Sequence, residues 1–117
     1  RPAGGGAAMS PLAGERCEAC HSGTPRVEGE ELERLRGELG PDWRVEEGRL
    51  RRRMRFPDFV RAAGRAMEVA LLAEAEGHHP DLGLGWGYLE IELSTHAIGG
   101  LSRNDFILAA KIDSLDG

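Results

Sequence analysis

Leucines recur at helical spacing early in the chain. Leu32, Leu35 and Leu39 lie three and four residues apart, so they share one face of a helix. We expect this helix to begin near Glu30 and to stop at Gly40-Pro41, because glycine and proline both end helices.

The next segment has the pattern of a β-hairpin. Residues 43–45 and 49–56 are separated by Glu46-Glu47-Gly48, whose glycine suits a turn. One side of the second strand carries Leu50, Met54 and Phe56, and only Arg52 interrupts that apolar side.

A second helix is predicted between Pro57-Asp58, which suits a first turn, and Gly77, which suits a C-terminal end. At a spacing of three or four residues, one stripe along it holds Phe59, Ala63, Met67, Leu71 and Glu74. An apolar stripe normally faces the core. We therefore expect Glu74 to lie at or near the core side.

Residues 82–93 predict a second pair of strands with a turn near Gly87. Within it, Leu89, Ile91 and Leu93 alternate with Tyr88, Glu90 and Glu92, as in a half-buried strand. Ser102 then suits the N-cap of a third helix, with Asp105 in its first turn. The apolar side of that helix carries Phe106, Ala109, Ala110 and Ile112.

These elements follow one another as α-β-β-α-β-β-α. The simplest packing is a four-stranded antiparallel sheet with three helices on one face, which is an α+β domain. We expect a single domain over residues 27–117 and a flexible N-terminal arm over residues 1–26. Residues 1–8 are interpreted as a cloning remnant or a ragged end, with Met9 as the expected native start.

Composition limits the possible functions. The chain has 117 residues, 40% of them hydrophobic and 30% charged, with a formal net charge of −5. No apolar run approaches the roughly 18–20 residues needed to cross a bilayer, and the acidic balance makes nucleic-acid binding unlikely. No secretory signal follows Met9, so we expect a cytoplasmic protein.

The two cysteines stand in the sequence Cys17-Glu-Ala-Cys20-His21, which fits the attachment pattern of haem c. Haem c is attached outside the cytoplasm, and a zinc site would need two further ligands nearby. A dithiol without a ligand, carried on a flexible arm, is therefore the favoured interpretation.

Arginines cluster in the first hairpin. Arg49, Arg51, Arg53 and Arg55 share one side of a strand. The favoured interpretation is a solvated sheet face paired with Glu90 and Glu92. The alternative is a docking site for an anionic partner or a phosphorylated ligand. Trp43 and Trp86 are interpreted first as packing residues.

The candidate chemistry lies at the ends of the predicted elements. His78 and His79 follow the second helix, His96 ends the last strand, and Asp105 begins the third helix. Imidazoles exchange protons near neutral pH, and a carboxylate can fix their tautomer. Taken alone, the spacing leaves three alternatives open: acid–base catalysis, a three-histidine zinc site, or polar turns without chemistry.

Several of these residues together resemble the signature of the pterin-4a-carbinolamine dehydratase family. The matching positions, spread over more than thirty residues, are Glu74, His78-His79-Pro80, Trp86, Ser94-Thr95-His96 and Asp105. The resemblance covers about residues 17–112 and implies four antiparallel strands with three helices on one side. Gly83, Gly85 and Gly87 depart from it, because they make the strand after the histidine pair unusually rich in glycine.

The resemblance implies an enzyme that removes water from a 4a-hydroxytetrahydropterin, without metal or cofactor, in tetrahydrobiopterin recycling. It implies that His78, His79, His96 and Asp105 are the catalytic residues. It also implies that the substrate-binding residues are Glu74, Pro80, Trp86, Ser94 and Thr95. We expect His78 and His96 to act as the acid–base pair, and we expect His79 to bind and orient the pterin.

The resemblance also implies a homodimer or homotetramer, to which pairing of edge strands is one route. Two alternatives to the recycling function stay open. One is a non-catalytic dimerisation or regulatory module. The other is a dehydratase-like protein acting on a molybdenum-cofactor pterin.

Overall fold

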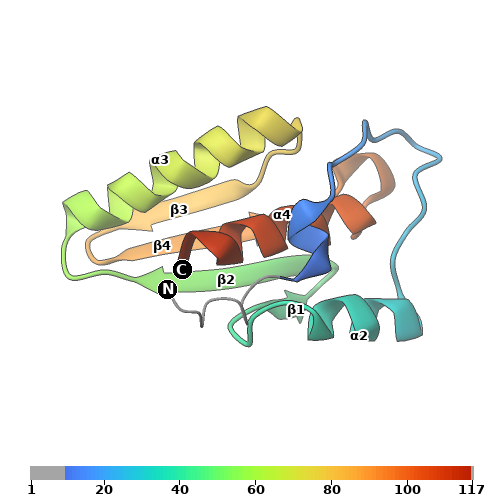
Figure 1. Ribbon diagram of the computed structural model, residues 1–117, viewed down its shortest axis with the longest axis horizontal. Coiled ribbons are helices and arrows are strands. Elements are labelled where there is room, and N and C mark those ends of the chain that lie inside the picture. Colours follow the sequence, from blue (N-terminus) through green and yellow to red (C-terminus); the bar gives the residue numbers. More distant parts are fainter. Residues whose placement is uncertain (1–9, 117) are drawn as a thin grey trace.

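Four antiparallel strands form the centre of the computed structural model, which describes residues 10–116. They are β1 (Arg44–Glu46), β2 (Arg49–Arg55), β3 (Asp81–Gly85) and β4 (Tyr88–Leu93), arranged in the order β1-β2-β4-β3. The helices are α2 (Gly29–Gly37), α3 (Phe59–Glu76) and α4 (Arg103–Asp113). In Figure 1, α3 and α4 cover the sheet while α2 lies beside β1. The predicted α+β class and element order are confirmed.

Short 3-10 helices complete the structure: η1 (Pro11–Gly14), η2 (His96–Ile98) and η3 (Ser114–Asp116). The chain already packs from residue 10 onward, because Leu12 in η1 is fully buried and Lys111 of α4 donates to the Ala13 carbonyl at 2.9 Å. Part of the expected arm therefore lies against the domain. Its first nine residues, including Met9, lie outside the described residues.

The core lies between the sheet and the helices. Leu50 pairs with Leu93 and Met54 with Leu89 across β2 and β4, and these four side chains are buried. Helix α4 is buried along most of its length, with Phe106 and Leu108 fully inaccessible. The predicted alternation in both hairpins therefore reflects one apolar sheet face.

Arg52 interrupts this face and is nevertheless buried. Its guanidinium donates to Asp113 at 2.5 Å and to Asp116 at 2.7 Å, and the Trp43 indole also donates to Asp113, at 2.8 Å. A buried charge is tolerated when it is paired and hydrogen-bonded. The interruption thus marks an internal ion pair, and the packing role expected of Trp43 is confirmed, since only 1% of it is exposed.

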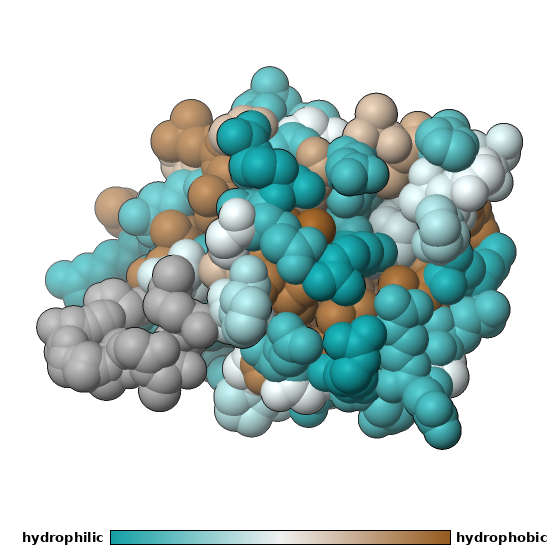
Figure 2. Space-filling model, turned by 45° about the vertical axis from the view of Figure 1, so that its right-hand side comes forward, coloured by the Kyte–Doolittle hydropathy of each residue, from teal (hydrophilic) through white to brown (hydrophobic). Residues whose placement is uncertain are grey.

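The prediction of which face of α3 packs against the core is wrong. Phe59, Met67 and Leu71 of the predicted stripe are 48–64% exposed, whereas Ala62, Val69 and Ala73 face the core. Helix α3 has apolar residues on two sides, and the side with small alanines allows it to lie close to the sheet. Glu74 consequently points outward, with 77% of its side chain exposed. Figure 2 shows hydrophobic side chains at its upper left, on the side of the molecule where α3 lies.

The opposite face of the sheet carries the arginines. Arg51 lies 2.6 Å from Glu92 and Arg53 lies 2.7 Å from Glu90, so the predicted pairing is confirmed. The Arg53 guanidinium also stacks over the Tyr88 ring at 4.0 Å. That ring occupies the space of a side chain at Gly85, where an added Cβ would lie 2.2 Å from it. Glycine in β3 thus makes room for a stacked tyrosine.

None of the helices in residues 10–116 has the length and apolar character needed to cross a membrane.

Candidate active site

The ends of α3 and β4 bring the predicted residues to one end of the sheet. Gly77 ends α3 in the left-handed conformation, with a φ of 67°, and turns the chain toward His78. Because β3 and β4 are antiparallel and Asp81 pairs with Glu92, the same register continued past the end of β3 brings residues 78–80 beside residues 93–95, directly before His96. This is the end where α3 finishes in Figure 1.

A buried hydrogen bond joins His78 to Asp105. The distance between His78 Nε2 and Asp105 Oδ1 is 2.6 Å, and the two residues are 8% and 0% exposed. Asp105 Oδ2 accepts from the Thr95 hydroxyl at 2.7 Å and from the Ser102 N–H at 2.9 Å. Three groups thus surround one carboxyl group, and the ionised form of a carboxyl only accepts hydrogen bonds.

This arrangement fixes the proton positions. Since Thr95 donates to Asp105, Ser102 donates its hydroxyl proton to Thr95, and the two oxygens are 2.7 Å apart. When Asp105 is ionised, His78 donates from Nε2, so its Nδ1 can accept a proton from elsewhere and deliver it again once the ring is an imidazolium. The site therefore orients one imidazole through a buried carboxyl group.

His79 forms a second pair on the outside of the molecule. Its Nε2 lies 2.7 Å from Glu74 Oε1, and both side chains are more than half exposed. The outward direction of Glu74, which corrects the sequence expectation, brings this acid to His79. The pair can hold the His79 ring in place beside the His78 turn.

His96 stands at the start of a small loop. The Thr95 N–H donates to the Gly100 carbonyl at 2.8 Å and closes the loop that contains η2. Thr95 points inward to Asp105, while His96 is exposed. Ser94 and Pro80 are half-buried at the same end of the sheet.

Trp86 lies far from the other predicted site residues. It lies in the β3–β4 turn at the opposite end of β3, about 20 Å along the strand from Pro80 at ~3.3 Å per residue. It is also 73% exposed, so the packing role expected of it is wrong.

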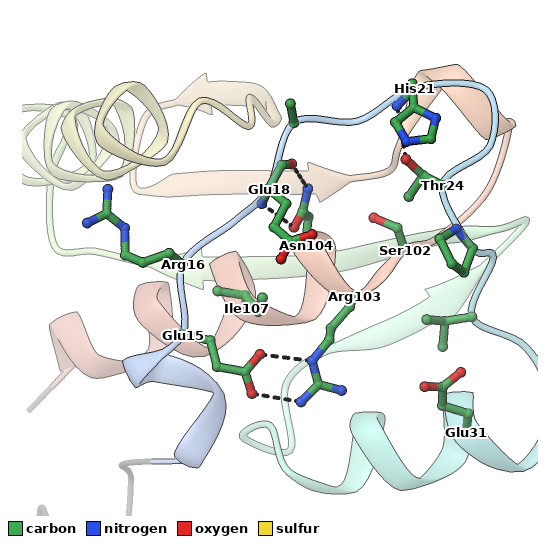
Figure 3. Close-up of a pocket in the computed structure, with 13 residues that line it drawn as sticks. Glu15, Arg16, Glu18, His21, Thr24, Glu31, Ser102, Arg103, Asn104 and Ile107 are labelled. Carbon is green, nitrogen blue, oxygen red and sulfur yellow. Dashed lines mark hydrogen bonds and ion pairs between the residues drawn. The ribbon is translucent and has the colours of Figure 1, made fainter.

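A pocket of about 340 Å³ lies under the N-terminal segment (Figure 3). Its walls come from residues 15–31, which include part of α2, and from the first turns of α4. The predicted histidines do not line it. Ser102 does, and it connects this pocket to Thr95 and Asp105. No sequence pattern predicts this pocket, because its lining residues have no recognisable spacing.

The two cysteines lie along α4 as free thiols. Cys17 Sγ is 3.6 Å from the Asn104 carbonyl, and Cys20 Sγ accepts from the Asn104 amide at 3.0 Å. Burial raises the pKa of the Cys17 thiol to about 12, and the negative charge of Glu76 adds to this effect. Within residues 10–116, no group of three or more histidine, cysteine, aspartate or glutamate side chains could hold a metal ion.

Comparison with known proteins identifies relatives along most of the chain. The family model described as "Pterin 4 alpha carbinolamine dehydratase" matches residues 25–115. A Rickettsia canadensis protein is 45% identical over 107 residues, covering 91% of this chain and 98% of its own. A Rubrobacter xylanophilus protein is 48% identical over 108 residues, covering 92% and 100%. Both carry the provisional name pterin-4-alpha-carbinolamine dehydratase.

Two solved structures share the fold. A transcriptional coactivator/pterin dehydratase from Brucella melitensis has a TM-score of 0.74 and 26% identity, covering 80% of this chain and 100% of its own. A pterin dehydratase-like protein, identified as a RuBisCO assembly factor in the alpha-carboxysome, has a TM-score of 0.53 and 25% identity. It covers 64% of this chain and 87% of its own.

Proposed function

The chain belongs to the pterin-4a-carbinolamine dehydratase family, and on this premise we propose that it removes water from 4a-hydroxytetrahydropterin to give quinonoid dihydropterin. Its homologues are named as this hydro-lyase. The observation that carries the proposed mechanism is the buried hydrogen bond between His78 and Asp105.

The reaction needs one proton delivered and one removed. Hydroxide is a poor leaving group, so an imidazolium protonates the 4a-oxygen and the C–O bond breaks with loss of water. A neutral imidazole takes the proton from a ring N–H as the C=N bond forms. We assign these two steps to His78 and His96, without choosing which ring performs which step.

Asp105 supports His78 in this scheme. Its Oδ1 orients the imidazole through Nε2, and its negative charge stabilises the imidazolium form. His79, held by Glu74, binds and orients the pterin. Pro80 and the backbone of Ser94 and Thr95 line the pterin edge. Trp86 stands too far along β3 to contribute to the same site in one chain.

Alanine substitutions of the three histidines test these roles. His78→Ala and His96→Ala should each lower kcat by roughly a hundredfold, within the usual contribution of acid–base groups. His79→Ala should chiefly raise KM. The measurements are the dehydration rate of 4a-hydroxytetrahydropterin and the affinity for a dihydropterin analogue. Unchanged kcat in both His78→Ala and His96→Ala would sink the mechanism.

The biological setting proposed here is recycling of the pterin used by aromatic amino acid hydroxylases. The same site could instead serve a molybdenum-cofactor pterin, and rates with the two substrates would separate these settings. A non-catalytic binding module is the alternative from another class, favoured by the two structural relatives, a transcriptional coactivator/pterin dehydratase and a RuBisCO assembly factor. An inactive wild-type protein would support that alternative.

We also propose self-association into a homodimer or homotetramer. Its support is the outer face of α3, where Val60, Met67 and Leu71 are exposed. Exposed apolar side chains that gather in one place commonly mark interaction sites.

A further inference from the structure

The N-terminal segment contacts each of the chain segments that carry the candidate site. We call residues 15–27 the strap. It crosses the end of α3 before His78, the start of α4 beside Asp105, and the loop that begins with His96. These segments are far apart in sequence, and the strap lies over all three.

The first contacts tie the strap to α3 and α4. The Cys17 N–H donates to Glu76 Oε1 at 2.8 Å, two residues before His78. The Asn104 side chain accepts from the Glu18 N–H at 3.0 Å and donates to the Glu18 carbonyl at 2.6 Å. Asn104 directly precedes Asp105. The His78–Asp105 hydrogen bond already joins the end of α3 to the start of α4. The strap therefore joins these two helix ends a second time.

The last contacts hold the His96 loop. Arg26 donates to the Gly99 carbonyl at 3.3 Å and also to the Ile98 carbonyl. The next residue, Val27, donates its N–H to the Leu101 carbonyl at 2.8 Å. The Arg26 guanidinium lies so close to Gly100 that a Cβ there would be 2.7 Å from Arg26 Nη1.

The loop has few other restraints. Within residues 95–100, backbone bonds of Thr95 close the loop and the Gly99 N–H donates to the His96 carbonyl at 3.2 Å, while the exposed His96 makes no side-chain hydrogen bond in the described structure. Among residues 10–116, the Ile98 and Gly99 carbonyls accept hydrogen bonds only from Arg26. Arg26 thus supplies their donor from outside the loop.

We propose that the strap positions the active site and that Arg26 is the positioning residue for His96. This inference rests on the proposed dehydratase function. A guanidinium bound to two successive carbonyls fixes the loop backbone, and through it the direction of the His96 ring. Misplacing a catalytic group by about 1 Å can cost a large factor in rate.

The test compares Arg26→Met with Arg26→Lys, using Arg55→Met as the matched control. Arg55 lies on β2 at the far end of the sheet, opposite Tyr88. Arg26→Met should lower kcat by roughly tenfold, Arg26→Lys should recover part of it, and Arg55→Met should leave it unchanged. Gly100→Ala, which displaces the guanidinium without removing it, should act like Arg26→Met.

A double-mutant cycle shows whether Arg26 acts through His96. On a His96→Ala background, Arg26→Met should cause no further loss, because the group it positions is already absent. An equal loss on both backgrounds, or an unchanged kcat for Arg26→Met alone, would overturn the inference.

A second readout separates this inference from the proposed function. In proton NMR, the His96 Cε1–H resonance of the full chain should shift in Arg26→Met but not in Arg55→Met. If the wild type has no dehydratase activity, the proposed function fails, while the resonance still decides whether Arg26 orients His96. An unshifted His96 resonance would refute the role of Arg26.

Discussion

Asp105 has a structural task and, in the proposed mechanism, a chemical task in the same carboxylate. Its Oδ2 accepts from the backbone of Ser102 at the start of α4, and its Oδ1 binds His78. The helix cap therefore fixes the group that orients the imidazole. A residue with this double role is expected to be sensitive even to an isosteric change.

We predict that Asp105→Asn lowers kcat by roughly a hundredfold, because the amide cannot accept at both positions and disturbs the His78 tautomer. Loss of the buried acceptor should also reduce the free energy of unfolding by about 1–3 kcal/mol. Steady-state kinetics and urea unfolding measure the two effects. The matched control is Asp81→Asn at the exposed start of β3. Wild-type kinetics in Asp105→Asn would refute the assigned role.

At the scale of elements, α3 shows how a helix end delivers a site residue. The interior Gly64 has open space around its Cβ position, whereas Gly77 has a positive φ of 67° at the helix end. Only the second position requires glycine, since left-handed backbone is costly for other residues. The turn to His78 depends on it.

These two glycines give a paired prediction. Gly77→Ala should reduce the free energy of unfolding by about 1 kcal/mol, while Gly64→Ala should increase it by about 0.5–1 kcal/mol through better helix propensity. Urea midpoints at constant slope are the measurement. If both substitutions shift the midpoint in the same direction, the assignment of Gly77 as the helix cap is wrong.

The junction of α3, α4 and the strap contains a buried acid. Only 6% of the Glu76 side chain is exposed. Burial by itself would raise the pKa of Glu76, but the Cys17 N–H, Lys111 and Arg16 outweigh it and hold that pKa below its usual 4.5. Ionised Glu76 therefore stabilises the fold above that pH, and this contribution is lost as pH falls through the lowered value.

We predict that Glu76→Gln reduces the free energy of unfolding at pH 7 by about 1.5–3 kcal/mol, as for hydrogen bonds to charged groups. The deficit relative to wild type should shrink as pH falls below about 4.5, because wild type then loses the same charge. Urea unfolding between pH 7 and pH 3 measures this, with exposed Glu33→Gln as the control. A deficit independent of pH would contradict it.

At the scale of the whole molecule, the outer face of α3 remains uncovered in a single chain. Val60 is 76% exposed, Leu71 64% and Met67 60%. Helix α3 therefore packs its alanine-rich side against the sheet and exposes its larger apolar side chains to solvent. The fold is complete without this face, which makes it available for a second copy.

We predict that the wild type is oligomeric and that Met67→Glu combined with Leu71→Glu yields a monomer, because buried carboxylates oppose association. Light scattering after size exclusion, at several concentrations, measures the mass. Arg55→Glu on the opposite sheet face should leave the mass unchanged. A monomeric wild type would refute self-association, and an unchanged mass in the double variant would exclude this face.

The sequence by itself determined the element order, the two hairpins and the cap at Ser102, and it indicated the candidate residues for acid–base chemistry. Periodicity, glycine turns and caps depend on neighbours within a few positions, so they can be recognised without a structure. Tertiary structure alone decided which of two apolar sides of α3 is buried and that Trp86 lies far from the histidines. It also decided that His78 meets an aspartate 27 positions away and that the strap holds Glu76, Asn104 and the His96 loop. These outcomes depend on close packing and hydrogen bonds between distant segments, which local patterns do not encode.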